Sequence, residues 1–553
     1  MDMKKWFSRY LVAGSCLMAM NLVACSDSSS GADDDDDAAS SSSRPDSDSG
    51  IADIGTGDEE KGVTYVTISE IMYNAPEGSE LEWVELTISS GDKIFNMNAS
   101  NLHLDGAISY TFPKDAGSLD VGEYIVVAND LNLFKKTYPN FKGRLFGPWD
   151  GGKTVKLSNE GDVIDVKMTG KGDVSVAFSN EPPWPSLADG KGHTLVLKGG
   201  NATQASSWGA SKEVLGNPGE GPDSYIVASN VRLNEIKPYA SESDQGWIEL
   251  YNKGKSDVDV KGWKFKSKLK GKSWTIGGSN TKVPAGGYLV LKPTAEVFGE
   301  EFALSYLGGE YYLYEVVGGK ETGSESSLLL AASKKSSGVV DVSDGSIAQG
   351  ALAKETPGEA NSALAVGSVF INELHYHPAD ATGGKVDFPD EFLEIVNKSS
   401  SDISLYESIA GYGGKGWKIE GVNMEFGVGD VLKANGMTVL FPDSLEAAVS
   451  ADGLRKKYSI DSKVDIKFYK GKLSNRGEMV AVKKPVHCEK TTGEDGMVSS
   501  HCYYDWSDAT LYSDKWKGFA QTDGYGQSMQ RAKFETMGYE ASAWKAAAPT
   551  PGK

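Results

Sequence analysis

The sequence lacks the residues and motifs that mark several classes of protein. Its 553 residues include only 4 cysteines and 6 histidines. No stretch matches the GxSxG elbow of hydrolases, the HExxH zinc motif or an EF-hand loop, and no P-loop or dinucleotide-binding fingerprint occurs in a strand-to-helix context. After the N-terminal leader, no run approaches the roughly 18 apolar residues of a membrane-spanning helix. These absences favour a protein that is not an enzyme and uses no cofactor.

Clustered positive charge is also missing. The chain has 56 Lys and Arg against 77 Asp and Glu, a formal net charge of −21. Binding to a phosphate backbone needs clustered basic residues, so no nucleic-acid partner is expected. The chain is too long for one hydrophobic core, and roughly two to four domains are expected. Its 65 glycines favour many short strands joined by tight turns.

The N-terminus has the pattern of a secretory leader. Lys4, Lys5 and Arg9 form a positive region, followed by a mostly apolar stretch over residues 10–23. The leader ends in LVAC, which resembles the lipobox of bacterial lipoproteins. The resemblance implies that residues 1–24 are removed and that Cys25 is acylated, which would anchor the protein in the cell envelope, with the outer membrane as the expected location. The alternative is an ordinary signal peptide with a chance cysteine.

Residues 25–62 form a segment of Ser, Asp and Gly with little to bury, including an acidic run at residues 33–37. Such a composition predicts a disordered, extended tether. The tether is interpreted as a solvated spacer. A second interpretation is an export address to the outer face of the membrane, as acidic runs behind the lipidated cysteine serve in some surface lipoproteins.

A pair of short sequence patterns occurs three times. The first pattern combines a hydrophobic residue, a polar residue, Glu and another hydrophobic residue, at Val66–Asn74, Val231–Pro238 and Phe370–Pro378. The second, of the EWVEL type, follows at Glu82–Leu86, Gly246–Asn252 and Glu391–Asn397. The spacing of the copies is that of domains rather than solenoid units, so three related domains in series are expected.

Within each copy the residues alternate as in β-strands. A period of two places Ile68 with Glu70 on one strand face and Ile71 on the other. LSN turns at residues 157–159 and 473–475 supply the turn positions of hairpins, whereas the second copy has no such turn. Many short strands at this spacing predict an all-β fold of β-sandwiches.

These patterns resemble the lamin tail domain, an immunoglobulin-like β-sandwich. The likeness rests on the ISEIMYNAP type of opening, the EWVEL strand, and closings in GNPG or TPG at residues 216–219, 356–358 and 550–552. It implies three sandwiches, at residues 63–222, 223–362 (divergent) and 363–553. The third is longer, with an expected insertion near residues 485–525. Because lamin tail modules accompany catalytic domains in bacterial proteins, the resemblance implies a recruiting role.

Cys488 and Cys502 are the cysteines that remain beyond the leader and anchor. In an envelope protein they are expected to form a disulfide closing a surface loop. A zinc site with His487 and His501 is the alternative. It is disfavoured because each histidine directly abuts its cysteine, which hinders coordination of one ion.

Paired glutamates recur in all three copies: Glu70 with Glu85, Glu235 with Glu249, and Glu373 with Glu394. Two carboxylates can act as acid and base in glycoside hydrolysis. A structural role is preferred, because one chain rarely needs three identical active sites, and buried carboxylates require hydrogen-bond donors.

Two further groups of side chains are candidate ligand sites. One is a divalent-metal site in the third copy, formed by His375, His377, Asp387 and Glu394. The same histidines also fall at the positions of Met72 and Asn74 in the first copy, which favours a strand without metal. The other is a set of tryptophans that would stack on sugar rings: Trp149, Trp184, Trp506 and Trp516.

Three functions follow from these alternatives. The preferred one is an envelope-anchored, non-enzymatic lipoprotein whose sandwiches bind or scaffold a protein or polysaccharide partner through loops or exposed edges. The second is a polysaccharide-binding protein of the cell surface. The third is a metal-dependent hydrolase that uses the third domain.

Overall fold

A computed structural model describes residues 63–76, 81–169, 173–221, 225–268, 271–300, 302–343, 345–378, 390–475, 477–492, 498–513 and 516–553. The expected leader, Cys25 and the tether lie outside the described residues, as does Asp387. No helix in the described part of the chain is long and apolar enough to cross a membrane.

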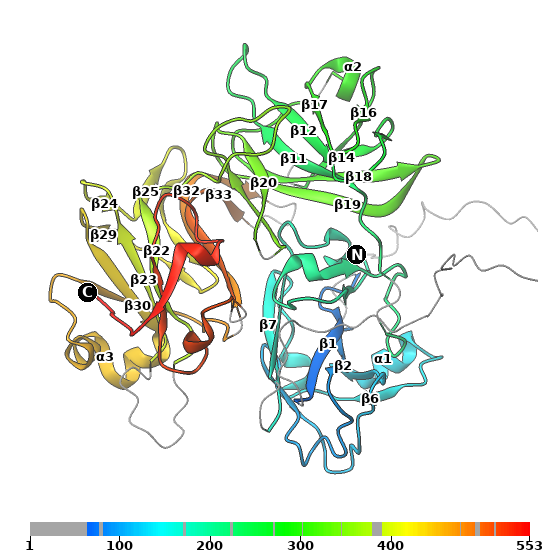
Figure 1. Ribbon diagram of the computed structural model, residues 1–553, viewed down its shortest axis with the longest axis vertical. Coiled ribbons are helices and arrows are strands. Elements are labelled where there is room, and N and C mark those ends of the chain that lie inside the picture. Colours follow the sequence, from blue (N-terminus) through cyan, green and yellow to red (C-terminus); the bar gives the residue numbers. More distant parts are fainter. Residues whose placement is uncertain are drawn as a thin grey trace, which may run out of the picture. The chain divides into compact units, whose positions relative to one another are not determined.

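Strands make up most of the described secondary structure, so the all-β prediction is confirmed (Figure 1). The α-helices are α1 (Leu131–Thr137), α2 (Ala295–Phe298) and α3 (Asp443–Tyr458). Single turns of 3₁₀-helix lie at η2 (Gly152–Thr154), η3 (Ser186–Ala188), η4 (Ala205–Ser207), η5 (Ala520–Thr522) and η6 (Ala541–Ala543). Each β-sheet formed by the described residues draws its strands from one of three segments, residues 63–221, 225–362 and 363–553.

The first segment contains a six-stranded sheet in the order β10-β9-β1-β2-β5-β6 and a four-stranded sheet in the order β4-β3-β7-β8. Its strands are β1 (Tyr65–Met72), β2 (Trp83–Ser90), β3 (His103–Gly106), β4 (Tyr110–Thr111), β5 (Ile125–Ala128), β6 (Arg144–Phe146), β7 (Gly161–Lys167), β8 (Val174–Ser179), β9 (Leu195–Leu197) and β10 (Trp208–Ala210). Residues of both sheets share one hydrophobic core, which makes the segment a sandwich.

The second segment pairs a five-stranded sheet, β17-β12-β11-β20-β21, with a four-stranded sheet, β15-β14-β18-β19, and adds the pair β13-β16. Its strands are β11 (Val231–Lys237), β12 (Trp247–Asn252), β13 (Val258–Asp259), β14 (Lys264–Ser267), β15 (Lys272–Thr275), β16 (Lys282–Val283), β17 (Tyr288–Leu291), β18 (Gly309–Val317), β19 (Lys320–Leu330), β20 (Ser337–Asp341) and β21 (Ile347–Ala351). The core again takes residues from both sheets.

The third segment has a six-stranded sheet, β31-β30-β23-β22-β34-β35, a four-stranded sheet, β28-β27-β32-β33, and two short pairs, β24-β29 and β25-β26. Its strands are β22 (Val369–His375), β23 (Phe392–Asn397), β24 (Ile403–Ser404), β25 (Tyr406–Ile409), β26 (Gly413–Gly416), β27 (Lys418–Glu420), β28 (Met424–Glu425), β29 (Val431–Leu432), β30 (Met437–Pro442), β31 (Asp465–Tyr469), β32 (Gly477–Thr492), β33 (Val498–Ser513), β34 (Ser528–Arg531) and β35 (Trp544–Ala547). Both larger sheets contribute to its core.

The opening strand pair has the same register in all three segments. In β1–β2, Ile68 lies opposite Leu86, but the next pair is Glu70 with Glu85, so Ser69 forms a β-bulge. The pairs β11–β12 and β22–β23 carry the same irregularity one residue before their glutamates. The bulge puts Ile68 and Ile71 together in the core. The expectation that Ile68 and Glu70 share a face was therefore wrong, because it assumed an uninterrupted strand.

The first and third segments cover the outer face of this sheet with a helix. In the first, α1 follows β5 and places Phe134 in a cluster with Trp83. In the third, α3 follows β30 and places Leu454 against Phe392 and Phe441. In both, the strand after the helix pairs in parallel with the strand before it, the connection that a crossover helix permits.

Candidate functional site

The six recurrent glutamates are buried in the outer face of the opening strand pairs, where each first glutamate lies directly opposite its second. Burial of a carboxylate is costly unless donors surround it. The structure supplies those donors from the closing residues of each segment, the same GNPG and TPG stretches that the sequence showed.

The first glutamate of each pair binds the residue before the closing proline. The backbone N–H of Asn217 donates to Glu70 Oε1 at 3.3 Å. Thr356 donates to Glu235 through its backbone N–H at 3.2 Å and its hydroxyl at 2.8 Å. Thr550 donates to Glu373 in the same two ways, at 2.8 and 2.7 Å.

The second glutamate of each pair binds the glycine after that proline. The backbone N–H groups donate over 2.5 to 2.7 Å in the pairs Gly219 to Glu85, Gly358 to Glu249 and Gly552 to Glu394. The bulged residue donates to the other carboxylate oxygen over 2.5 to 2.8 Å, from Ser69, Asn234 and Asn372. We call this arrangement of two glutamates, a bulged polar residue and an x-Pro-Gly turn the glutamate clamp.

The chemistry of the turn explains the residue types of the glutamate clamp. Proline has no N–H, so the donors come from the residues on either side of it. The glycine adopts a positive φ, +87° at Gly219, +84° at Gly358 and +74° at Gly552, which suits position i+2 of a type II turn. The carboxylates are thus engaged in closing each sandwich.

Burial perturbs these carboxyl groups. It raises the pKa of Glu249 to about 7 and that of Glu394 to about 7, in each case against the effect of the hydrogen bonds. It also raises the pKa of Glu70 and of Glu85. Such values would suit an acid or base, but every one of these carboxylates is bound by donors of its own segment.

The structure does not assemble the metal site considered for the third segment. His375 is buried beside Phe392, and its Nδ1 lies 3.0 Å from the carbonyl oxygen of Asp390. Nδ1 of His377 lies 2.6 Å from Asp523 Oδ1, and Glu394 belongs to the glutamate clamp. Within the described residues, no group of three or more His, Cys, Asp or Glu side chains could hold a metal ion.

The structure does not support the expectation that four tryptophans are exposed to stack on sugar rings. Trp149, Trp184 and Trp516 are buried in the cores of the first and third segments, with at most 9% of their surface exposed. The fourth, Trp506, is half-buried, and Lys483 Nζ lies 4.8 Å from its ring centroid. Loop position in the sequence suggested exposure, but these side chains fold back into the sandwich because they are large and apolar.

The disulfide between Cys488 and Cys502 is present in the structure. Its setting differs from the expected surface loop, because the two cysteines are directly paired residues of the antiparallel strands β32 and β33. Much of the expected insertion near residues 485–525 is thus an extension of a hairpin. The corresponding hairpins of the other segments, β7–β8 and β18–β19, are shorter.

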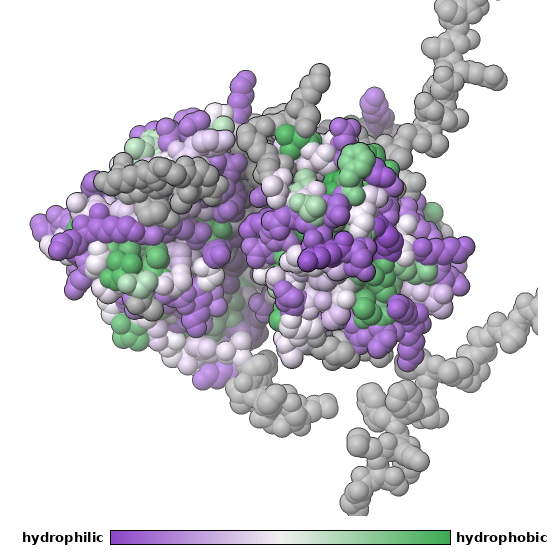
Figure 2. All heavy atoms as spheres, turned by 90° about the horizontal axis from the view of Figure 1, so that it is seen from below, coloured by the Kyte–Doolittle hydropathy of each residue, from purple (hydrophilic) through white to green (hydrophobic). Residues whose placement is uncertain are grey.

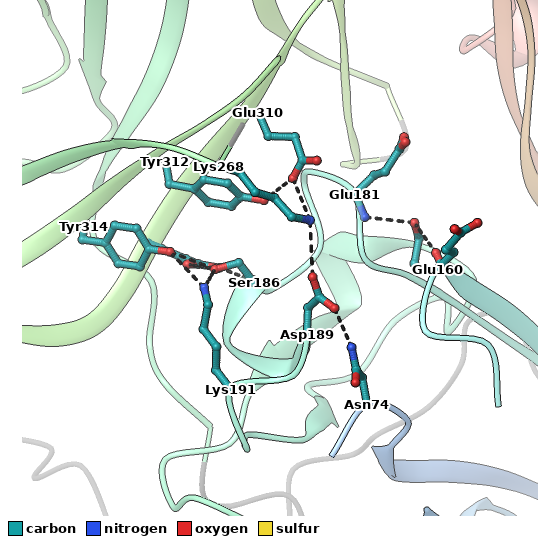
Figure 3. Close-up of polar contacts among 12 residues, drawn as sticks. Asn74, Glu160, Glu181, Ser186, Asp189, Lys191, Lys268, Glu310, Tyr312 and Tyr314 are labelled. Carbon is teal, nitrogen blue, oxygen red and sulfur yellow. Dashed lines mark hydrogen bonds and ion pairs between the residues drawn. The ribbon is translucent and has the colours of Figure 1, made fainter. Parts of the chain in front are cut away.

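A network of polar contacts joins residues of the first and second segments (Figure 3). The hydroxyl of Ser186, at 6% exposure, lies 2.9 Å from the Tyr314 hydroxyl and donates to Glu325 Oε2 at 2.6 Å. The ammonium group of Lys191 donates to the same hydroxyl at 2.9 Å. The network is therefore built on one buried hydroxyl between a carboxylate and an ammonium group.

A second chain of contacts runs beside it. Asn74 donates to Asp189 Oδ1 at 2.7 Å, and Lys268 bridges Asp189 at 3.3 Å and Glu310 at 3.2 Å. The hydroxyl of Tyr312 donates to Glu310 at 2.6 Å. Because these charged groups are paired with one another, we assign the network a structural role.

A cleft of about 1870 Å³ borders these contacts and is lined by residues of all three segments. Its wall carries paired charges, including Lys483, which lies 2.6 Å from Glu420 and 3.6 Å from Glu181. The volume exceeds the usual range of small-ligand pockets, about 300 to 1,000 Å³. The surface seen in Figure 2 is mostly hydrophilic, with hydrophobic residues in small separate patches. We call the cleft of about 1870 Å³ the polar cleft.

Residues 226–345 match the model of the Lamin Tail Domain family. The matched lamin tail region lies in the second segment, whose sequence was expected to be divergent. It contains β11 and β12, and it ends before the Thr356 to Gly358 turn that completes their glutamate clamp.

Comparison with solved structures and curated proteins adds little. The chain is similar to a crystal structure of a DUF4876 family protein from Bacteroides thetaiotaomicron, with 12% identity, a TM-score of 0.19, and coverage of 53% of this chain and 89% of that one. No curated protein matches the chain. The lamin tail match therefore supports the β-sandwich fold of the second segment.

Proposed function

We propose that this chain is an envelope-anchored lipoprotein without catalytic activity, in which three lamin-tail-like sandwiches in series bind or scaffold a protein or polysaccharide partner. The anchor rests on the lipobox-like sequence ending at Cys25. The three sandwiches rest on the recurring strand register, on the glutamate clamp and on the lamin tail match at residues 226–345.

The observation that supports a binding role is the engagement of all six recurrent glutamates. Each accepts hydrogen bonds from its own segment and lies at 0 to 2% exposure. A catalytic pair needs access to substrate, and these carboxylates face the closing turn instead. What recurs in the chain is thus a device for folding, which is typical of a scaffold whose specificity lies on other surfaces.

The polar cleft is the proposed surface for the partner. Its size suits a polypeptide segment or a polysaccharide chain better than a small molecule. Its wall combines charged and apolar groups, which is typical of a non-obligate interface, in which polar groups set specificity.

A matched pair of charge reversals tests the polar cleft. Lys472 is exposed and lines it, whereas Lys463 is exposed in the same segment and does not. The acylated full-length protein, in detergent, is immobilised and offered solubilised envelope proteins and, separately, envelope polysaccharide. We expect Lys472→Glu to reduce recovery of a bound component severalfold and Lys463→Glu to leave it unchanged. Equal recovery by both variants would remove the polar cleft from the proposal.

The same experiment separates the alternatives. Retention of polysaccharide alone would favour the sugar-binding function, although three of the four expected tryptophans are buried. Hydrolysis of the offered polysaccharide that depends on an added divalent ion would favour the hydrolase and contradict a non-enzymatic role.

A further inference from the structure

A row of three polar residues crosses the end of the main sheet in the first segment. Met72 pairs with Trp83, and Trp83 pairs with Ala128, so the next residues along these strands, Tyr73, Glu82 and Asn129, are neighbours. The backbone N–H of Asn129 donates to the carbonyl of Glu82 at 2.9 Å, which extends the register by that residue. Alternation puts Glu82 and Tyr73 on the core side of the sheet, with Val84 and Ile71.

The third segment keeps two residues of this row, whereas its register places Pro442 at the third position. Tyr376 and Glu391 occupy the positions of Tyr73 and Glu82, and Tyr469 replaces Asn129 as the donor, at 2.5 Å from its hydroxyl to Glu391 Oε1. Leu473 donates to the same oxygen at 2.8 Å. The hydroxyl of Tyr376 lies 2.8 Å from that of Thr522.

The second segment has no such row. The same register places Pro238, Gly246 and Pro293 at the three positions. This segment also lacks the LSN turn, whose first residue, Leu157 or Leu473, donates its N–H to Glu82 or Glu391 in the other segments. A lamin-tail-like sandwich therefore forms without the row, so the fold alone does not require it.

In the first segment the row is incomplete. The hydroxyl of Tyr73 and Oδ1 of Asn129 are buried and have no hydrogen-bond partner among the described residues, and both side chains are only 1% exposed. Glu82 receives two donors, Asn129 at 3.3 Å and Leu157 at 3.1 Å, and both bind Oε2. Its other oxygen, Oε1, receives neither of them.

A cavity of about 370 Å³ lies beside this row. Tyr73 and Glu82 line it, together with the LSN turn. The residue that packs on Tyr73 is Phe178, with ring centroids 4.7 Å apart, whereas the third segment has Tyr512 against Tyr376. The hydroxyl of Tyr512 donates to the Ser474 carbonyl at 2.6 Å. The first segment thus has no counterpart of the Tyr512 hydroxyl beside its LSN turn.

We propose that this cavity binds a primary ammonium group, held by the Glu82 carboxylate and the Tyr73 hydroxyl, the two residues of the row that line it. An ammonium group has three N–H donors and no acceptor, and the cavity offers it a carboxylate and a hydroxyl that has no hydrogen-bond partner among the described residues. Its positive charge compensates a carboxylate that is 4% exposed. A sugar hydroxyl supplies one donor and no charge.

The rim carries one charge of each sign. Lys156 and Glu160 both line the cavity, on either side of the LSN turn, and Asp162 accepts the Ser158 N–H at 2.9 Å behind it. The rim is therefore close to neutral, and the buried carboxylate provides the attraction for a cation. Ser158 and Glu160 also line the polar cleft, so an ammonium group on a partner bound there has a route to the cavity.

Calorimetric titration of the full-length protein tests the proposal at pH 8. The probes are N-acetyl-lysine methylamide, which carries the side chain of a protein partner, and putrescine, a free diamine; N-acetyl-norleucine methylamide is the uncharged comparator. We expect the two amines to bind and the comparator to give no heat. Tighter binding of the lysine derivative points to a protein source, and tighter binding of putrescine to a free polyamine. No heat from either amine would overturn the site and leave ordered water as its occupant.

Two conservative variants sharpen the result. Phe178→Tyr restores the hydroxyl found in the third segment, and Tyr73→Phe removes one proposed acceptor. Tyr73→Phe is expected to weaken amine binding about tenfold, since a hydrogen bond to a charged group contributes that much. Phe178→Tyr is expected to weaken it as well, because the added hydroxyl takes up space beside Tyr73. Tyr73→Phe deletes a hydroxyl without a partner, so it should not lower the urea midpoint. Binding unchanged in both variants would show that the amines bind elsewhere.

Discussion

The backbone N–H of Gly358 donates a 2.5 Å hydrogen bond to Oε2 of Glu249, across 109 residues of chain. The equivalent bonds join Gly219 to Glu85 and Gly552 to Glu394, across 134 and 158 residues. In each segment the closing turn is thus fastened to the second strand of the opening pair. This long-range contact explains why the glutamates recur while the residues around them vary.

Removing one clamp carboxylate should destabilise its own segment. Glu249→Ala leaves the Gly358 N–H and the Asn234 amide without their acceptor in a buried site. Unsatisfied buried donors cost about 1–3 kcal/mol each, so we expect a loss of about 2–4 kcal/mol. Urea unfolding measures the loss, and hydrogen exchange of β11 and β12 assigns it to the second segment.

Glu242→Ala is the matched control for this prediction. Glu242 is an exposed glutamate of the same segment, so its removal should change the urea midpoint little. If Glu249→Ala and Glu242→Ala unfold at the same urea concentration, the glutamate clamp does not stabilise the fold.

Local patterns in the sequence were enough to predict the all-β class and to pick out the glutamate pairs that recur in the three copies. They also placed His375 at the position of Met72 and Lys237, and the register agrees, since these residues pair with Phe392, Trp83 and Trp247. Such features depend on alternation within one strand, which a sequence shows directly.

Other features depend on contacts that alternation does not encode. The bulge at Ser69 adds one residue to β1. The residues before it therefore point to the opposite sheet face from the one that uninterrupted alternation predicts. The x-Pro-Gly donors lie more than 100 residues from their glutamates, so the patterns were visible but their pairing was not. Burial of Trp149 and Trp184 is set by tertiary packing, and loop position gave the wrong expectation. The helices were missed for the same reason.

The cross-strand disulfide should stabilise the long hairpin of the third segment. Cys488 and Cys502 are 14 residues apart, and closing such a loop contributes about 3 kcal/mol in the chain-entropy model. Replacing both cysteines by serine should lower the urea midpoint of the third segment. Mass spectrometry should show a gain of two hydrogens on reduction. A midpoint identical to that of the unmodified protein would mean that strand pairing alone holds the hairpin.

Cys25 should determine membrane association. In cells that process lipoproteins, Cys25→Ala removes the acylated thiol, and we expect the protein to leave the membrane fraction and lose incorporation of labelled fatty acid. The double replacement of Cys488 and Cys502 is the control, because it removes cysteines without touching the lipobox-like sequence. Continued fractionation of Cys25→Ala with membranes would contradict the acyl anchor.

Stability should fall as the pH rises from about 5 to 8. Burial raises the pKa of Glu391 to about 7 in the folded chain, against 4.5 for the ordinary group. Between these values the folded state binds more protons than the unfolded state, so raising the pH favours unfolding. Glu249 and Glu394 act in the same direction.

Glu391→Gln isolates one of these contributions. Both donors to Glu391, the Tyr469 hydroxyl and the Leu473 N–H, bind Oε1, so a glutamine in the same position can keep both bonds while it cannot ionise. We expect the variant to be about 1 kcal/mol more stable than the unmodified protein at pH 8, and the difference to vanish near pH 5. Urea midpoints at the two pH values measure it. A variant that is less stable at pH 8 would mean that the ionised carboxylate is preferred at this site, and that its hydrogen bonds outweigh its burial.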